Sequence, residues 1–352
     1  MRELRTAVIG CGMISRNHLK ALRQVENVRC VAVCDLEEEK AQKASEEYGI
    51  PEIYTDYKEM LRCPDIDVVH VCTPHHLHAQ MVIDALHAGK HVLCEKPMAL
   101  TMEDAGRMES AAKISGKQMG VCFQNRYNAT SVYMKKMLDS GRLGKVKGAR
   151  GQVTWDRKPE YYQNSPWRGR WETEGGGVLI NQAIHTFDLL QWLTVPIKQV
   201  EASISTRKLK QVIEVEDTAE IYMTGEGGER LLFYASNCYV KNAPVELEII
   251  CENGSVRLRG NQVTVEEGGK VWTMDDSSGT VLGKDYWGSG HGILIDDFYR
   301  CIRSGAPFPV GPKEAMSVVE LTAAVYRAAR EGISVEIPGK KEGDADEEEK
   351  RR

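Results

Sequence analysis

The sequence predicts a protein of two domains, an α/β domain with a doubly wound parallel sheet and then an α+β domain with a larger sheet rich in hairpins. The chain has 352 residues, which is more than one ordinary compact core requires. Over about the first 120 residues, short apolar runs alternate with helical patterns, as they do around a parallel sheet. After residue 200, strand patterns follow one another with glycine turns between them, as antiparallel hairpins require.

The composition is that of a globular protein, with 42% hydrophobic and 28% charged residues. The net charge of -5 gives no basic footprint for nucleic acid. No apolar run is long enough to cross a bilayer, and Met1–Arg5 leads into a strand rather than a signal peptide, so we expect a cytoplasmic location. The ten cysteines form no Cys-x-x-Cys pair, so we interpret them as reduced and expect no metal site.

A glycine turn near the N-terminus indicates a dinucleotide site. The apolar strand 6–9 runs into the turn 10–15, Gly-Cys-Gly-Met-Ile-Ser, and a helical pattern follows. Gly10 permits the tight turn. Gly12 lets the backbone approach a pyrophosphate, which then rests on the amides of the helix N-terminus.

Asp35 follows the second strand, 30–34, about twenty residues after the glycine turn. A carboxylate there can accept hydrogen bonds from both ribose hydroxyls, and it would repel a 2′-phosphate. No arginine follows it directly, so the sequence favours NAD over NADP. The alternative is a structural strand–turn–helix unit with an incidental acid.

The first domain continues with the same alternation. The remaining strands are expected at 53–54, 67–72, 91–94 and 118–123. One helix is expected to end at residue 49, two more to span 57–61 and 79–88, and a fourth to begin at Thr101. Thr101 and Asp104 have the spacing of a capping box.

Polar motifs follow two of these strands. Thr73-Pro74-His75-His76-Leu77-His78 follows the strand 67–72, and Glu95-Lys96-Pro97 follows the strand 91–94. Ligands bind at the carboxyl ends of strands in doubly wound sheets. Because Pro97 biases Lys96 toward an extended conformation, the ammonium should project from this edge and could polarise a hydroxyl or carbonyl. A surface ion pair is the alternative interpretation.

A polar stripe follows three consecutive glycines, Gly175–Gly177. Asn181, His185 and Asp188 have the spacing i, i+4, i+7, which predicts one face of a helix. Glycines let a backbone turn sharply or pass close to a bulky group. If the chain binds a redox cofactor, this stripe is the natural place for an acid–base group.

The second half of the chain begins with a helix at 133–138 and a strand at 145–155. The loop 161–171 is dense in aromatic residues and arginine, which suit a pyranose ring, although aromatic anchors of an ordered loop are the alternative. Further strands are expected at 200–208, 217–223, 230–238, 245–251, 255–259, 262–266, 270–274 and 334–337, with helices at 286–304 and 313–331.

Taken together, the motifs resemble the glucose–fructose oxidoreductase / inositol dehydrogenase / MocA (Gfo/Idh/MocA) family over roughly residues 5–338. They are Gly10-Cys11-Gly12 with Asp35, Thr73-Pro74 with His78, Glu95-Lys96-Pro97, and Gly175–Gly177 with Asn181 and His185. The resemblance implies a Rossmann domain, 1–123, and a substrate-binding α+β domain with an open, mostly antiparallel sheet, 124–338. The charged tail, 339–352, is expected to be disordered.

The resemblance also implies roles for individual residues. His185 would be the general base or acid, and Lys96 would bind the same hydroxyl and assist the proton transfer. Residues expected at the cofactor are Gly10, Gly12, Met13, Ile14, Asp35, Thr73, Pro74, His75, His78, Glu95, Lys96, Gln124, Trp167 and Arg168. Residues expected at the substrate are Asn181, Arg126, Tyr162 and His291, with a buried capping role as the equal alternative for His291.

Asn181 is a departure from the family pattern, because many inositol dehydrogenases carry aspartate there. An amide can hydrogen-bond but cannot act as a base. The asparagine therefore puts myo-inositol in doubt as the substrate and concentrates proton transfer on His185 and Lys96.

The function predicted is reversible oxidation of a secondary hydroxyl of a sugar, glycoside or cyclitol by NAD. The family's use of the free sheet face implies a homodimer or homotetramer. One alternative is a glycoside hydrolase or lyase that recycles NAD through a transient 3-keto sugar. Another is a non-catalytic, dinucleotide-sensing protein on the same fold.

Overall fold

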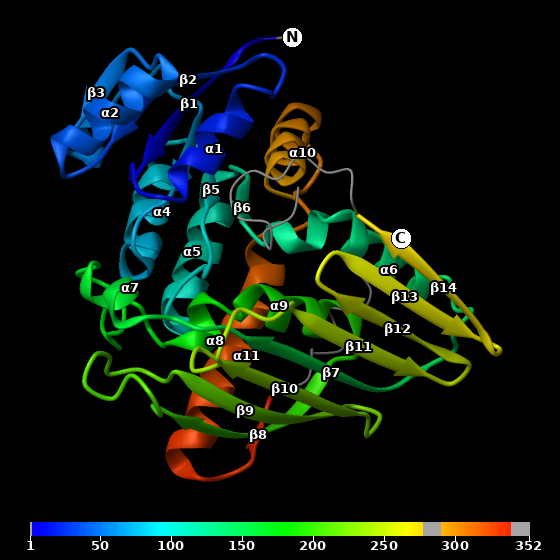
Figure 1. Cartoon of the computed structure of the whole chain (residues 1–352). Coiled ribbons are helices and arrows are strands. Elements are labelled where there is room, and N and C mark those ends of the chain that lie inside the picture. The colour runs from blue at the N-terminus through cyan, green and yellow to red at the C-terminus, as the bar shows by residue number, and fades with distance from the viewer. Residues whose placement is uncertain (1, 277–289, 339–352) are drawn as a thin grey trace.

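The computed structural model describes residues 2–276 and 290–338. Two sheets dominate it, one in the N-terminal half and one in the C-terminal half, with helices α9 and α11 between them (Figure 1). The predicted disordered tail, 339–352, lies outside the described residues, and so does the start of the helix predicted from 286.

The first sheet has six strands in the order β3-β2-β1-β4-β5-β6, and every pair is parallel. This is the strand order of a Rossmann fold, so the predicted doubly wound sheet is confirmed. Its strands are β1 Leu4–Ile9, β2 Val28–Cys34, β3 Glu52–Tyr54, β4 Val68–Val71, β5 His91–Cys94 and β6 Met119–Val121. All four residues of β4 are buried, as expected for a strand covered on both faces.

The second sheet has nine strands in the order β14-β13-β12-β11-β7-β10-β9-β8-β15. Only β7 and β10 pair in parallel, so the predicted, mostly antiparallel sheet is confirmed for the described residues. Its strands are β7 Val146–Thr154, β8 Ile197–Ser205, β9 Thr218–Gly225, β10 Arg230–Ser236, β11 Glu246–Cys251, β12 Gly254–Arg259, β13 Gln262–Glu267, β14 Lys270–Asp275 and β15 Val335–Glu336.

One face of the second sheet is covered and the other is open. Along β10, Leu231 and Phe233 are buried, whereas Leu232 and Tyr234 between them are exposed. This period of two places alternate side chains on opposite faces, and the covered face packs under helices α6, α9 and α11 (Figure 1).

The helices follow the predicted pattern closely. They are α1 Ser15–Leu22, α2 Glu38–Tyr48, α3 Tyr57–Leu61, α4 His78–His87, α5 Met102–Ser115, α6 Ala129–Asp139, α7 Pro159–Gln163, α8 Val178–Asn181, α9 Ile184–Leu193, α10 Gly290–Ser304 and α11 Pro312–Glu331, with short 3-10 turns at η1 His75–Leu77 and η2 Gln124–Tyr127. Thr101 caps α5 as predicted, because its side chain accepts a hydrogen bond from the Asp104 amide. None of the helices in the described ranges is long and apolar enough to cross a membrane.

The prediction that one helix carries Asn181, His185 and Asp188 is wrong. Helix α8 ends at Asn181 and α9 begins at Ile184, so the helix is interrupted between them. The Ala183 amide reaches back to the Val178 carbonyl, one residue beyond the usual α-helical partner. The three polar residues therefore start from two short helices, and each meets a different partner.

Helices α10 and α11 return the chain to the first domain. Phe298 and Tyr299 of α10 are fully buried in the same apolar core as the Rossmann strands. Helix α11 contacts both α5 and strand β8, so it joins the two sheets. The boundary predicted at residue 123 stays a prediction, but residues from 290 to 319 share the first core.

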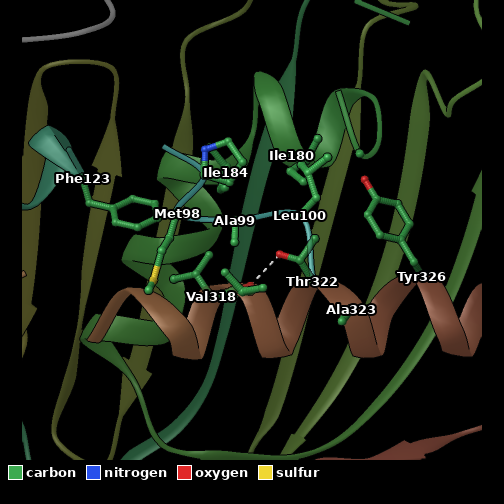
Figure 2. Close-up of a pocket in the computed structure, with 13 residues that line it drawn as sticks. Met98, Ala99, Leu100, Phe123, Ile180, Ile184, Val318, Thr322, Ala323 and Tyr326 are labelled. Atoms are coloured by element: carbon green, nitrogen blue, oxygen red, sulfur yellow. Dashed lines mark hydrogen bonds between the residues drawn. The ribbon is translucent and has the colours of Figure 1, made fainter. Parts of the chain in front are cut away.

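Figure 2 shows how α11 supports the segments that carry the polar motifs. Met98 and Leu100 follow Lys96, Ile180 and Ile184 flank the helix break, and all of them face one side of α11. The space that they enclose is about 30 Å³, which is too small for a sugar. This apolar layer holds the two motifs in place and is not itself a substrate site.

Candidate active site

The glycine turn has the geometry that a dinucleotide requires. Gly10 has φ of +91°, and a Cβ there would lie 2.6 Å from the Cys72 carbonyl oxygen, so the protein itself demands glycine. A Cβ at Gly12 would meet no protein atom within 4 Å. Packing therefore does not explain Gly12, whereas close approach of a phosphate at the start of α1 does.

Asp35 lies beside this turn. Its Oδ2 accepts a hydrogen bond from the Cys11 amide at 2.8 Å, and its Oδ1 accepts one from the Glu37 amide at 3.0 Å. Each carboxylate oxygen can accept a second bond, so both remain able to receive a ribose hydroxyl. Gly12 and Asp35 thus fit the adenosine half of NAD. Met13 and Ile14 lie in the turn between Gly12 and the start of α1.

Of the histidines after β4, His75 joins the two domains and His78 stays within the first. His75 Nδ1 lies 2.8 Å from the Glu174 carbonyl oxygen, and its ring is 4.7 Å from that of Trp167. His78 lies between the carbonyl oxygens of Pro97 and Thr73, at 2.8 and 2.9 Å. Both rings therefore shape the loops at the strand ends, and their predicted contact with the cofactor stays a prediction, as does that of Pro74.

Arg168 stacks on the aromatic loop that precedes Gly175. Its guanidinium carbon lies 4.9 Å from the centre of the Trp167 ring and 4.5 Å from that of Tyr161. The Trp-Arg pair predicted at the cofactor is therefore held beside His75, at the same sheet edge as the histidine motif.

Lys96 reaches across the domain junction. Its Nζ donates a hydrogen bond to the backbone carbonyl of Asn181 at 3.0 Å, so β5 and α8 meet at this lysine. Burial lowers the pKa of Lys96, while the negative charges of Glu95 and Glu174 oppose that shift. An ammonium has three donors, and one contact with Asn181 leaves two for a substrate oxygen.

His185 lies at the first turn of α9, beside η2. Its Nε2 is 3.2 Å from the Gln124 side-chain nitrogen, and its Nδ1 is buried with no hydrogen-bond partner among the described residues. Burial lowers the pKa of His185 well below 6.5, and the charge of Lys96 lowers it further. The imidazole is therefore neutral at physiological pH, which is the form that can accept a proton.

Glu95 lies in a buried polar cluster behind Lys96. Its Oε1 is 2.9 Å from His18 Nε2 and 3.9 Å from His291 Nε2. Burial alone would raise the pKa of Glu95, but hydrogen bonds and charges from the two histidines outweigh burial and hold the pKa well below its usual range. The carboxylate is thus ionised and faces histidines instead of solvent.

Cys122 completes this cluster. The ligand-type atoms of His18, Glu95 and Cys122 lie within 4.8 Å of one another, which is close enough to hold a metal ion. His18 and Glu95 already hydrogen-bond to each other, so their proximity is explained without a metal. The expectation of no metal centre stays a prediction.

Two buried glutamates frame the glycine segment. Glu174 accepts hydrogen bonds from the Gly169 amide and from the Asn181 side chain. Glu216 accepts them from the Gly177 and Leu179 amides at 2.8 and 3.0 Å. Burial raises the pKa of Glu174 to about 7, against the hydrogen bonds that it accepts.

The glycines themselves are required by protein contacts. A Cβ at Gly176 would lie 1.9 Å from the Tyr326 hydroxyl, and one at Gly177 would lie 1.8 Å from the Glu216 carbonyl oxygen. Neither position tolerates a side chain. The close approach predicted for this segment is therefore to the protein interior.

Three residues predicted at the substrate have protein partners. Arg126 forms a buried, bidentate ion pair with Asp188, so Asp188 is a structural partner of Arg126. Tyr162 is 3% exposed, and its hydroxyl accepts a hydrogen bond from Asn237 at 2.8 Å. His291 is 1% exposed beside Glu95, which matches the alternative of a buried histidine at the start of α10. Their roles toward substrate stay predictions.

Sequence reasoning missed His18, Glu174 and Glu216. Glu174 had a local signal, since it directly precedes the three glycines that lead to Asn181 and His185. His18 had only its place in an amphipathic helix. Glu216 lies in a loop far along the chain, and no local pattern relates it to Gly177.

The fold and the site define an oxidoreductase with an NAD-binding Rossmann domain. Two family models match the chain: the oxidoreductase family with an NAD-binding Rossmann fold over residues 4–123, and the GFO/IDH/MocA C-terminal domain over residues 131–257. The chain belongs to the Gfo/Idh/MocA family of oxidoreductases, as the sequence motifs predicted.

Relatives and solved structures agree with this assignment. Inositol 2-dehydrogenase of Salmonella typhimurium is 32% identical over 321 residues, 88% of each chain. D-apiose dehydrogenase of Paraburkholderia graminis is 26% identical over 347 residues, 96% of this chain and 90% of that one. The WlbA dehydrogenase of Bordetella pertussis, solved with NADH and UDP-GlcNAcA, is 31% identical with a TM-score of 0.83, covering 96% of this chain and all of that one.

Proposed function

We propose that this protein oxidises a secondary hydroxyl of a sugar, glycoside or cyclitol with NAD, with His185 taking the hydroxyl proton and Lys96 stabilising the oxygen. The observation that carries the proposal is the meeting of Lys96 with the Asn181 carbonyl at 3.0 Å, which brings the Rossmann strand end to the helix pair that holds His185. Relatives named inositol 2-dehydrogenase and D-apiose dehydrogenase act on polyols of this class.

The two residues proposed to act on the reacting hydroxyl have different protonation states, His185 neutral and Lys96 charged. Held at the glycine turn by Gly12 and Asp35, NAD would supply the acceptor for the hydride that leaves the carbon bearing the hydroxyl. His185 is neutral, and its Nε2 accepts the hydroxyl proton once the substrate hydroxyl replaces the Gln124 side-chain nitrogen that lies 3.2 Å from it. The Lys96 ammonium donates to the oxygen as negative charge develops there. In the reverse direction, the protonated His185 returns the proton to the alcohol.

A panel of sugars, glycosides and cyclitols tests the proposal. Each compound is incubated with the protein and NAD or NADP, and reduction is followed by NADH absorbance. We expect at least one polyol to reduce NAD. Cleavage of a glycoside without net NADH would favour the NAD-recycling alternative, and no turnover with any polyol would favour a dinucleotide sensor.

Asp35 is expected to set the preference for NAD. Replacing it in Asp35→Ser removes a carboxylate that repels a 2′-phosphate, while Lys40 and Lys43 still line the adjoining groove. We expect the ratio of kcat/KM with NAD to kcat/KM with NADP to fall by ~10–100-fold. An unchanged ratio would show that Asp35 does not read the ribose. Asp65→Ser, an exposed acid elsewhere in the domain, is the control.

The open face of the second sheet is proposed to pair with a second copy of the chain. Leu232 and Ile250 on this face are 50% and 49% exposed, and Tyr234, two residues after Leu232 on β10, is 36% exposed. Such an apolar surface is typical of an association site. We expect light scattering to give a dimer or tetramer, and Leu232→Asp to shift it to monomer. An oligomer unaffected by this change would place the interface elsewhere.

A further inference from the structure

We propose that Glu174 is a positioning residue of the catalytic centre: it fixes the Asn181 amide so that the oxygen Oδ1 is offered to the substrate, and it steadies the carbonyl that holds Lys96. The inference rests on the proposed function, in which Lys96 and His185 act on a substrate hydroxyl. It adds an acid that the motif spacing did not identify.

Glu174 is held at every polar atom of its side chain. The residue is 0% exposed. Its Oε2 accepts a hydrogen bond from the Gly169 amide at 2.5 Å, and its Oε1 accepts one from Asn181 Nδ2. Its backbone carbonyl contacts His75 of the Rossmann domain at 2.8 Å, so the main chain of Glu174 is anchored at the domain junction.

The chemistry of the pair decides which way the amide faces. In its ionised form Glu174 only accepts hydrogen bonds, so Asn181 turns its Nδ2 toward Glu174 and its Oδ1 away from it. Within the described part of the chain, Oδ1 of Asn181 makes no hydrogen bond. It is also not one of the buried side-chain atoms that lack a hydrogen-bond partner. It therefore remains accessible, and a hydroxyl of the substrate can donate to it.

The same asparagine holds Lys96 through its main chain. The Asn181 carbonyl accepts from Lys96 Nζ, and the Glu174 charge favours the ammonium form of that lysine. One buried acid thus acts on the site twice, through the orientation of the amide and through the position of the ammonium.

This pairing also gives a physical reason for the asparagine at 181. An aspartate there would face the Glu174 carboxylate at hydrogen-bond distance with no donor between them, and two like charges at that distance repel. In this chain the carboxylate lies one layer behind the amide. The asparagine at 181 and the acid at 174 are therefore a complementary donor and acceptor.

A cycle of exchanged partners tests the inference. The variants are Glu174→Gln, Asn181→Asp and the double variant, with Glu172→Gln, an exposed acid two residues away, as the control. In the double variant the introduced glutamine can accept from the Gly169 amide and donate to the introduced aspartate, so every hydrogen bond of the pair is restored with the roles reversed. The readouts are kcat and KM on the polyol found by the panel, the Kd for NADH, and the melting temperature.

We expect Asn181→Asp to lower kcat/KM by ~100-fold or more and Glu174→Gln to lower it by about tenfold, mainly through KM. The double variant should recover to within about tenfold of the wild type, because coupled neighbours are not additive. The Kd for NADH and the properties of Glu172→Gln should stay as in the wild type.

Losses that simply multiply in the double variant would overturn the inference, and so would a Glu174→Gln enzyme with wild-type kinetics. If Glu174→Gln alone fails to fold, the comparison of Asn181→Asp with the double variant decides the matter, since only a direct pairing predicts recovery. Activity that depends on Lys96 but not on the exchanged pair would remove Glu174 and leave the proposed function standing.

Discussion

Lys96→Met is expected to lower kcat/KM for polyol oxidation by ~10³-fold and to leave the Kd for NADH nearly unchanged. Methionine keeps the length of the lysine stem but removes the ammonium, which donates to the Asn181 carbonyl and, as proposed, to the substrate oxygen. The loss should lie mainly in kcat, since the donor matters most when charge develops on that oxygen. Steady-state kinetics and NADH fluorescence measure the two effects separately.

Lys90→Met is the matched control. Lys90 is also buried in the Rossmann domain, and its Nζ donates to a backbone carbonyl, that of Cys63, at 2.8 Å. We expect this variant to have a lower melting temperature and a kcat/KM close to that of the wild type. A Lys96→Met enzyme as active as Lys90→Met would remove the lysine from the mechanism.

His185→Asn is expected to lower kcat for oxidation by ~10²–10⁴-fold, the usual contribution of a positioned base. Burial holds the pKa of His185 well below 6.5, so the wild-type imidazole stays neutral as the pH falls from 8 to about 6.5. Protonation removes the base, so the part of the acid-side loss of oxidation rate that belongs to His185 should begin only below pH 6.5. The variant should lack the acid limb that belongs to His185.

The measurement is kcat/KM for the polyol between pH 5 and 9, with His87→Asn, an exposed histidine at the end of α4, as the control. An acid limb that persists unchanged in His185→Asn would assign the titration to another group. Near-wild-type turnover in the variant would remove His185 as the base.

The Rossmann half was predictable because its signals are local. The strands are short apolar runs, helices α2, α3 and α5 have a cap or a glycine stop, and polar residues stand where strands end. The position of Lys96 followed from the strand 91–94 and from Pro97 alone. Local patterns of this kind survive folding because parallel strands bring their carboxyl ends to one edge.

The interior of the site was less predictable because its contacts are remote in sequence. Glu216 meets Gly177 across 39 positions, and Lys96 meets Asn181 across 85. The break between α8 and α9 is equally hidden, because residues 178–193 keep a helical pattern through it. Only the packed chain shows that Asn181, His185 and Asp188 serve different partners.

The return of α10 to the first domain could not be predicted from its amphipathic pattern. That pattern shows that one face of the helix is buried but does not identify what covers it. In the structure, the Tyr299 hydroxyl on this face lies 3.0 Å from His70 Nε2. His291 on the same helix lies beside Glu95. Residues from the end of the chain thus complete the polar cluster behind Lys96.

The most direct test of the central claim is the stoichiometry of one reaction. With the polyol found by the panel, the NADH formed and the carbonyl product formed are measured against the substrate consumed, in the wild type and in Lys96→Met. The account predicts one NADH and one carbonyl for each substrate, and a rate that collapses in the variant. A cleaved glycoside with no net NADH, or full turnover without Lys96, would contradict it.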